Sequence, residues 1–251
     1  MSEAATPERI HGAPDGYTIL VCASANTINA TLYKRLAFDF ARDLVPIAGL
    51  VLVPNLIAVH PSVPVRTVAE FIAHAKANPG KINMGSSGNG TTPHLAGELF
   101  KAMTGVDLVH VPYRGSAPSM TGLLAGDVQV SFMDITTALP HIRSGAVRAL
   151  AITTKTRNDA LPDLPSVADT VPGYETMAWF GFVVPKNTPA DVIEKLNREI
   201  NAALSDATIK ARLAELGTTP LVFTPAQFGA FIAAEIENWG RAVKYSGASV
   251  N

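Results

Sequence analysis

The sequence predicts an α/β protein, because short apolar strands alternate with amphipathic helices along most of its 251 residues. Two observations carry this prediction. Short apolar runs such as residues 17–23 (YTILVCA) are bounded by glycine or serine, which is typical of buried strands. Segments with helical spacing of apolar residues follow these runs, and each begins and ends with helix-capping or helix-breaking residues.

The most apolar stretch, residues 44–59, is expected to form two short buried strands around a turn. Pro46 and Pro54 interrupt it, so the strands are expected over residues 47–53 and 56–59. A membrane-spanning helix would need about 20 consecutive apolar residues. The sequence therefore predicts no transmembrane segment.

Helix starts are marked by threonine. Thr67 and Glu70 form the pattern of a capping box ahead of a helix that ends at Asn78. Three later helices are expected to begin at threonine–proline pairs, in which threonine caps and proline takes the first helical position. The pairs are Thr92-Pro93, Thr188-Pro189 and Thr224-Pro225. The last helix carries an apolar stripe expected to pack on the core, made of Phe228, Phe231, Ile232, Ile236, Trp239 and Val243.

Further strands are expected over residues 108–111, 147–153 and 179–184. Residues 128–132 alternate apolar and polar positions, which predicts a half-buried strand. The sequence shows no repeat and no low-complexity linker.

Composition excludes several classes of protein. A hydrophobic fraction of 47% with a charged fraction of 16% argues against disorder. The 20 basic and 21 acidic residues give a net charge of −1, without the basic surplus typical of a nucleic-acid-binding protein. The one cysteine, Cys22, lies within an apolar run and is expected to be a buried small hydrophobic residue.

The first twelve residues do not resemble a secretory leader. They contain Glu3, Glu8 and Arg9 and no apolar core. As written, the sequence is expected to have no export signal, and a cytoplasmic location is expected if Met1 is the true start.

The most informative motif is residues 84–94 (MGSSGNGTTPH), a glycine-rich loop ahead of a helix. Converging backbone N–H groups and the helix N-terminus would suit a carboxylate or phosphate, although a plain strand-to-helix turn remains the alternative. The segment lacks the lysine of a P-loop and does not match G-x-G-x-x-G or G-x-S-x-G. Its candidate ligand-binding residues are Ser86, Ser87, Gly88, Gly90, Thr91, Thr92 and His94, the serines as hydrogen-bond donors.

Other polar segments follow predicted strands in the same way. Arg114 could clamp a carboxylate or be an ordinary solvated side chain, and Ser116 is expected to be an N-cap. Asp134 could face a cleft or serve a turn. Small polar residues at the carboxyl end of a parallel strand are where open α/β sheets bind ligands. The candidates outside the glycine loop are Ser24, Asn26, Thr27, Tyr113, Arg114, Gly115, Ser116 and Asp134.

The sequence offers no catalytic or metal-binding pattern. None of the six histidines pairs at metal-ligand spacing, and no two carboxylates have a reason to act as acid and base. We expect neither metal nor cofactor, and a site that captures a ligand without transforming it.

Several motifs together resemble one family, from about residue 14 to residue 247. They are residues 15–20 (DGYTIL), 84–98 (MGSSGNGTTPHLAGE), 109–115 (VHVPYRG), 140–143 (PHIR), 149–152 (ALAI), 224–228 (TPAQF) and 235–239 (EIENW). They resemble the Bug-type (TctC-like) substrate-binding proteins of tripartite tricarboxylate transporters.

The resemblance implies a type II periplasmic-binding fold, with two α/β lobes, crossover strands and a ligand cleft between the lobes. One lobe would comprise residues 14–83 and 178–251, and the other residues 84–177. The expected ligand is a small carboxylate, namely a di- or tricarboxylate, an aromatic acid or an amino acid. The expected partners are the membrane permease subunits of the transporter. The resemblance also implies a periplasmic location and a monomer.

The sequence departs from the family at its start. Family members carry an export signal and then a strand–helix–strand unit before the segment that corresponds to residues 15–20. Only residues 1–13 precede the resemblance here, fewer than the roughly 30 that such a unit needs. We therefore expect an N-terminally shortened member with an unpaired sheet edge and exposed apolar surface.

Three alternatives remain open at this point. The chain could be a remnant that binds nothing. It could be a hydrolase that uses Ser86 or Ser87, although the sequence shows neither a base nor a nucleophile elbow. It could be a ligand-sensing domain, although no helix-turn-helix or basic patch accompanies it.

Overall fold

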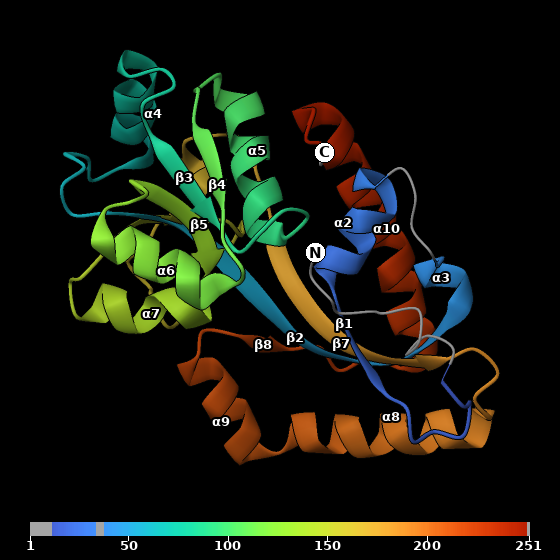
Figure 1. Ribbon diagram of the computed structural model, residues 1–251. Coiled ribbons are helices and arrows are strands. Elements are labelled where there is room, and N and C mark those ends of the chain that lie inside the picture. The colour runs from blue at the N-terminus through green and yellow to red at the C-terminus, as the bar shows by residue number, and fades with distance from the viewer. Residues whose placement is uncertain (1–11, 34–37, 250–251) are drawn as a thin grey trace.

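One long strand, β2 (Leu44–Val59), runs through both halves of the molecule in the computed structural model, which describes residues 12–33 and 38–249 (Figure 1). Its first part belongs to one sheet and its second part to another. We call these sheet A and sheet B, and the corresponding parts of the chain the sheet A lobe (residues 12–54 and 177–249) and the sheet B lobe (residues 55–176).

Sheet A is antiparallel. Strand β7 (Met177–Pro185) pairs with β2 on one side and with β1 (Leu20–Ala23) on the other, and the short β8 (Thr219–Pro220) also pairs with β2. Helix α8 (Ala190–Ser205) packs on one face through Ile193. Helix α10 (Pro225–Ser246) packs on the other face, where Trp179 and Phe228 form the centre of the core. Helices α3 (Phe40–Asp43) and α9 (Ala207–Glu215) also belong to this lobe.

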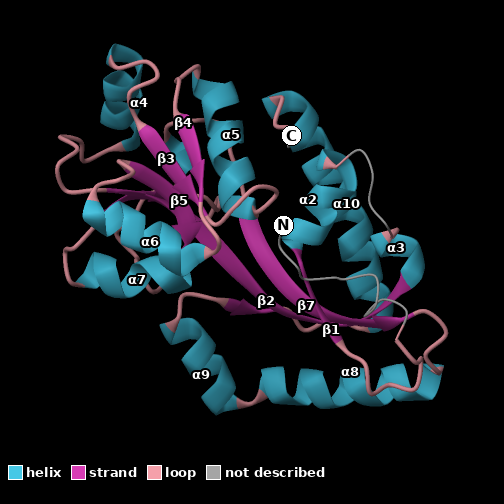
Figure 2. Cartoon of the chain, viewed as in Figure 1, coloured by secondary structure: helices cyan, strands magenta, loops and turns pink. Residues whose placement is uncertain are grey.

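Sheet B carries the parallel strands. Strands β5 (Val130–Asp134) and β6 (Arg148–Ile152) pair antiparallel with β2, while β5, β3 (Asn83–Ser86) and β4 (Val109–Pro112) run parallel to one another. Helices α4 (Val68–Ala77) and α5 (Thr92–Thr104) cover one face. Helices α6 (Ser116–Ala125) and α7 (Ile135–Arg143) cover the other (Figure 2), and the 3-10 turn η1 (Val167–Asp169) packs with the first pair.

The two lobes contact each other besides sharing strand β2. The Asn158 amide of the sheet B lobe donates to the Gly217 carbonyl of the sheet A lobe at 3.0 Å. At the boundary, the Thr153 hydroxyl donates to the carbonyls of Asn55 and Thr176, so the second part of β2, β6 and the residue ahead of β7 are linked. Beside the strands, helix α5 packs against α10 and α2 (Ser24–Leu32) of the sheet A lobe. The apolar cluster at this helix contact consists of Ile28, Leu32, Leu95, Trp239 and Val243.

The prediction of two short strands over residues 47–53 and 56–59 was wrong, because β2 is continuous. Pro46 lies at a register shift in the pairing with β7, where a missing N–H disrupts no regular ladder. Pro54 pairs with Met177 at the point where β2 leaves β7 and begins to pair with β5 and β6. Each proline therefore occupies a place where the hydrogen-bond pattern is already interrupted.

The first strand is also shorter and less buried than predicted. It begins at Leu20, and Tyr17 is 93% exposed. It lies at the edge of sheet A and is antiparallel, so the expectation of a parallel strand ahead of Ser24 was wrong. The strand predicted over residues 128–132 is more buried than expected. Strand β5 is central and buried on both faces, and the Ser131 hydroxyl donates to the Gly85 carbonyl.

Helix caps lie one residue away from some of the predicted positions. Thr91 rather than Thr92 is the N-cap of α5, Pro189 rather than Thr188 that of α8, and Gly115 rather than Ser116 that of α6. Thr224 caps α10 as predicted, and Gln227 completes a capping box that was not predicted from the sequence. Thr67 accepts from the Glu70 N–H as expected, but the Glu70 carboxylate accepts from the N–H of Arg66.

Three further predictions can be compared with the structure. Cys22 is buried, and burial raises the pKa of its thiol to about 12. Exposed apolar side chains do gather on and beside β1, where Ile19 and Val21 are 42% and 51% exposed. In the described part of the chain, no helix combines the length and the apolar character needed to cross a membrane. Residues 1–11, on which the leader prediction rests, lie outside the described residues.

Residues 55–83 pair and pack with sheet B through the end of β2 and α4. We therefore propose a lobe boundary within β2, near Asn55, in place of the boundary at residue 84 that the sequence suggested.

Candidate ligand-binding site

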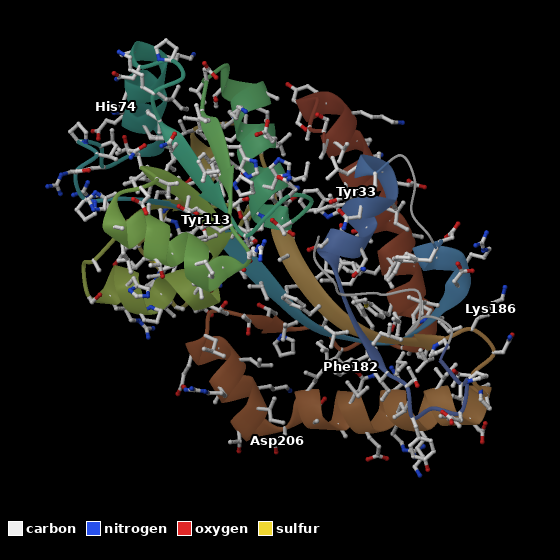
Figure 3. The ribbon with its side chains drawn as sticks, in the orientation of Figure 1. Tyr33, His74, Tyr113, Phe182, Lys186 and Asp206 are labelled. Carbon is white, nitrogen blue, oxygen red and sulfur yellow. The ribbon has the colours of Figure 1, made fainter. Side chains whose placement is uncertain are left out.

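The candidate site lies at the carboxyl ends of the three parallel strands of sheet B. Because β5, β3 and β4 are parallel, these ends share one edge of the sheet, and each strand leads directly into a helix. Helix α7 follows β5, α5 follows β3 and α6 follows β4. Tyr113, at the end of β4, marks this edge in Figure 3.

The N-termini of these three helices lack side-chain caps. Their N-cap residues are Thr91, Gly115 and Asp134, and none of these described residues makes a capping hydrogen bond. Helices α3, α4, α9 and α10, whose N-termini are not part of this edge, are all capped by a side chain. Helix α2 and α8 are uncapped as well. First-turn N–H groups of α5, α6 and α7 are thus left to a ligand or to water, with the positive end of each helix dipole behind them.

Internal hydrogen bonds hold the glycine loop in shape. The Gly88 N–H donates to the Ser86 hydroxyl at 3.2 Å, and the Thr91 hydroxyl donates to the Gly88 carbonyl at 2.7 Å. Gly88 has a φ of 124°, a conformation open to glycine but not to other residues. The Ser87 side chain is half-buried in this loop.

The loop after β4 is attached to the glycine loop. The N–H groups of Tyr113 and Gly115 donate to the carbonyls of Ser86 and Ser87 at 3.0 and 3.1 Å. The Tyr113 hydroxyl packs against Gly122 of α6, and Arg114 is exposed. The two loops therefore form one continuous backbone surface.

Asp134 lies at the end of β5 and forms one border of the candidate site. Its two carboxylate oxygens accept from the Asn55 amide and the Ser116 hydroxyl, each at 2.8 Å. Burial raises the pKa of this carboxyl group, and the two hydrogen bonds oppose the rise. Ser116 therefore binds Asp134 instead of capping α6.

The sheet A lobe reaches the site through α2. The Ser24 hydroxyl is 2.6 Å from the Thr92 hydroxyl, and both side chains are buried. Gly90 approaches Asn29 so closely that a Cβ at Gly90 would clash with the Asn29 amide oxygen. The side chains of Asn26 and Thr27 bind backbone atoms within the first turn of α2, to the Ala23 N–H and the Ser24 carbonyl.

Two histidines lie under the glycine loop. The rings of His94 and His110 are stacked, with centroids 4.2 Å apart. Burial is the main cause that lowers the pKa of each imidazole to about 4. The Ser86 hydroxyl is 2.6 Å from Nε2 of His110, so a base does lie beside this serine, contrary to the sequence expectation. Ser86 is completely buried, however, so no substrate could reach it as a nucleophile.

The structure thus places the glycine loop, residues 113–116 and Asp134 along one edge of sheet B, and brings Ser24 of the sheet A lobe into contact with Thr92. Sequence reasoning missed two residues of the arrangement, Asn55 and His110. An asparagine inside an apolar strand needs a buried hydrogen-bond partner, and this could have drawn attention to Asn55. His110 meets His94 only through the pairing of β3 with β4, and no local pattern reveals that contact.

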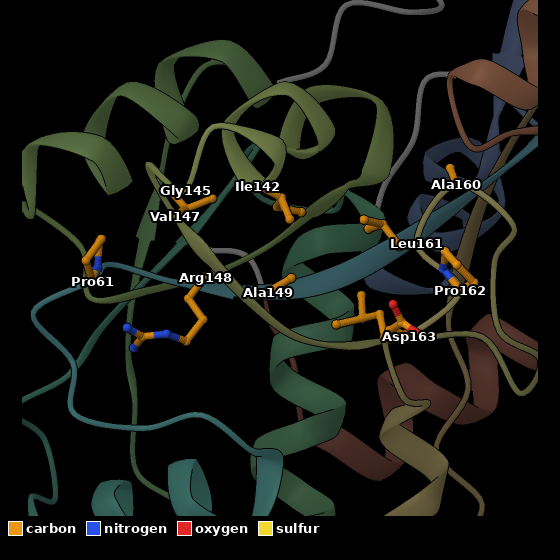
Figure 4. Close-up of a pocket in the computed structure, with 11 residues that line it drawn as sticks. Pro61, Ile142, Gly145, Val147, Arg148, Ala149, Ala160, Leu161, Pro162 and Asp163 are labelled. Atoms are coloured by element: carbon orange, nitrogen blue, oxygen red, sulfur yellow. The ribbon is translucent and has the colours of Figure 1, made fainter.

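A separate cavity of about 480 Å³ lies on the sheet B lobe between β6 and the loop that includes Leu161 (Figure 4). Arg148, Ala149 and Pro162 line it, and none of the predicted site residues does. In the residues that the structure describes, no three histidine, cysteine or acidic side chains are grouped as metal ligands would be.

Comparison with known proteins identifies the class. The model of the tripartite tricarboxylate transporter family receptor (TctC) matches residues 5–248, and the chain belongs to this family. The solved structure of Rpa4515 from R. palustris with adipate is 35% identical, with a TM-score of 0.93, over 96% of this chain and 82% of that one.

Two other solved structures are similar. The periplasmic binding protein BugD is 31% identical, with a TM-score of 0.90, over 96% of this chain and 82% of its own. MatC (Rpa3494) from Rhodopseudomonas palustris with bound malate is 28% identical, with a TM-score of 0.87, over 94% and 82%. The predicted periplasmic-binding fold is therefore confirmed. The family and these neighbours are substrate-binding proteins and not enzymes.

Proposed function

We propose that this chain is an extracytoplasmic solute-binding protein that captures a small carboxylate for the permease subunits of a tripartite tricarboxylate transporter. A di- or tricarboxylate is the preferred class of ligand, with aromatic acids and amino acids as the other members of the panel to be tested. The similar proteins solved with adipate and malate support the preferred class.

One observation carries the proposal. Three uncapped helix N-termini follow three adjacent parallel strands, and a glycine loop whose shape is held by internal hydrogen bonds leads into one of them. Oriented N–H groups and helix dipoles stabilise an anion without a charged side chain. This arrangement suits a protein whose net charge is only −1, because the attraction is local to the site.

The carboxylate of Asp134 adds hydrogen-bond acceptors to a site that otherwise offers donors. Because its oxygens already accept from Asn55 and Ser116, a further contact there favours a ligand group that donates a hydrogen bond. A ligand that presents a carboxylate to the loops and a hydroxyl or ammonium group towards Asp134 would satisfy both. In this mechanism, binding shifts an equilibrium between open and closed lobes by its greater affinity for the closed form.

Titration calorimetry with succinate, malate, adipate, citrate, benzoate and aspartate tests the function. We expect at least one to bind, and Ser87→Ala to weaken binding about threefold to tenfold through loss of one hydroxyl. Ser205→Ala, a remote change at the end of α8, is the matched control and should bind as the original protein does. Absence of binding by every member of the panel would favour the alternative of a non-binding remnant.

A further inference from the structure

The stacked histidines hold the glycine loop from below. His94 is only 4% exposed, and its Nδ1 accepts a hydrogen bond from the Gly90 N–H at 3.3 Å. Its ring stacks on His110 of β4, whose Nε2 contacts the Ser86 hydroxyl. Ser86 in turn accepts from the Gly88 N–H. Gly88 and Gly90 are thus both connected to the histidine pair.

The geometry fixes the protonation state of His94. An imidazole nitrogen that accepts a hydrogen bond carries no proton, so Nδ1 is bare and the ring is neutral. A proton added at Nδ1 would point at the Gly90 N–H, and two donors would face each other in a buried place. His110 is less constrained, because the Ser86 hydroxyl can either donate to Nε2 or accept from it.

We propose that His94, stacked on His110, is a positioning residue that keeps the glycine loop in its ligand-binding shape only while its Nδ1 is unprotonated, so that acid releases the loop. The proposal rests on the proposed function, since the loop matters as a ligand site. His94 itself is too buried to contact a ligand and acts through Gly90.

The surroundings of the pair favour the neutral state. Burial is the largest cause of the lowered pKa of each ring, and the Lys101 charge on α5 lowers both further. Glu98, which forms an ion pair with Lys101, acts on His110 in the opposite direction. Of the other elements packed on α5, β3 and α2 contain no titratable side chain and β5 contains Asp134. The titratable residues of α10 are Glu235, Glu237, Arg241, Lys244 and Tyr245.

Two variants distinguish the role of His94 as a hydrogen-bond acceptor from its role as a ring stacked on His110. His94→Asn places an amide oxygen near the position of Nδ1 and cannot titrate, whereas His94→Phe keeps a ring on His110 but offers no acceptor. His74→Asn, on the partly exposed helix α4, is the matched control. The readout is the Gly90 amide resonance in protein labelled with ¹⁵N-glycine and free of ligand.

We expect the Gly90 resonance of the original protein and of the control to move as the pH falls through about 4. In His94→Asn that transition should disappear, and in His94→Phe the resonance should already be displaced at pH 7. A Gly90 resonance that stays in place in His94→Phe, or that titrates in His94→Asn as in the original protein, would overturn the proposal. If His94→Phe does not fold, the pH titrations of the other three proteins decide alone.

A binding measurement at pH 7 links the loop to function. With adipate as the probe, His94→Phe should weaken binding about tenfold and His94→Asn by less than about threefold, since only the former leaves a buried donor unpaired. Equal losses in the two variants would contradict a role for the acceptor. If the original protein binds no carboxylate, the proposed function fails, and the Gly90 resonance still decides whether His94 positions the loop.

Discussion

The two lobes share the long strand β2 but differ in the direction of their other strands and in how their helix N-termini are capped. In the sheet B lobe the parallel strands end at one edge, and the helices that follow them have uncapped N-termini. In the sheet A lobe the described strands are antiparallel, and side chains cap α3, α9 and α10 but not α2 and α8, whose N-termini do not follow parallel strands. The backbone groups that suit an anion are thus concentrated in the sheet B lobe.

This difference shows which groups each lobe contributes to the candidate site. An antiparallel sheet alternates strand directions, so its helix N-termini are dispersed, whereas a parallel sheet brings them together. The sheet A lobe contributes the buried Ser24, which contacts Thr92, and the packing of α2 and α10 against α5. It also exposes apolar side chains on β1, while both faces of sheet B are covered.

The largest expected effect tests whether the lobes unfold as one unit. Trp179→Ala would remove a buried indole of the sheet A lobe, and Phe100→Ala a buried ring of the sheet B lobe. Each should lower the free energy of unfolding by about 3–5 kcal/mol. Because β2 runs through both sheets, urea denaturation followed by fluorescence and circular dichroism should show one transition in both variants. Two separate transitions would show that the lobes fold independently.

A smaller loss of unfolding free energy is expected when the contact between the lobes at the glycine loop is disturbed. Gly90 has a φ of 74°, and an added Cβ would clash with Asn29 of α2. Gly90→Ala should cost about 2–4 kcal/mol, from backbone strain together with the clash. Gly105 has a similar φ of 69° with nothing near an added Cβ, so Gly105→Ala should cost only about 1–2 kcal/mol. Equal losses in denaturant melts would mean that the contact with Asn29 contributes nothing.

The third effect is the pH dependence that the histidines confer on the sheet B lobe. The pKa of His94 falls from 6.5 to about 4 on folding, so between these values the unfolded chain binds a proton that the folded chain does not. Stability therefore rises with pH in this window and falls on acidification, by up to about 2 kcal/mol between pH 6.5 and 5 for His94. The partly exposed His110 adds less in the same direction.

Chemical denaturation at several pH values measures this slope. His94→Asn should flatten it, because the variant has no imidazole to protonate on unfolding. An unchanged slope in His94→Asn would show that other groups cause the acid sensitivity.

Local patterns in the sequence were enough to predict which segments make up the candidate site. The glycine loop, the segment at Tyr113–Ser116 and Asp134 were each recognisable because small polar residues follow an apolar strand and precede a helix. The sequence could not show that Ser116 binds Asp134 instead of capping α6, since that choice depends on the distance between two helices. Caps at Thr91 and Pro189 were missed by one residue for a similar reason: several neighbouring residues could serve as caps.

The path of the chain between the lobes was harder to predict. Proline usually ends a strand, and nothing local shows that Pro46 and Pro54 coincide with a register shift and a change of partner. The direction of β1 and the stacking of His94 on His110 likewise depend on pairings between distant segments. These features follow from the tertiary arrangement and not from the residues beside them.

The most direct test of the account is a titration of ¹⁵N-glycine-labelled protein with adipate, because glycines are distributed over the competing sites. We predict that the amide resonances of Gly88, Gly90 and Gly115 shift in a saturable way. Gly145, in the cavity of Figure 4, and the remote Gly173 should not move. A shift confined to Gly145 would place the ligand in that cavity and contradict a site at the ends of the parallel strands.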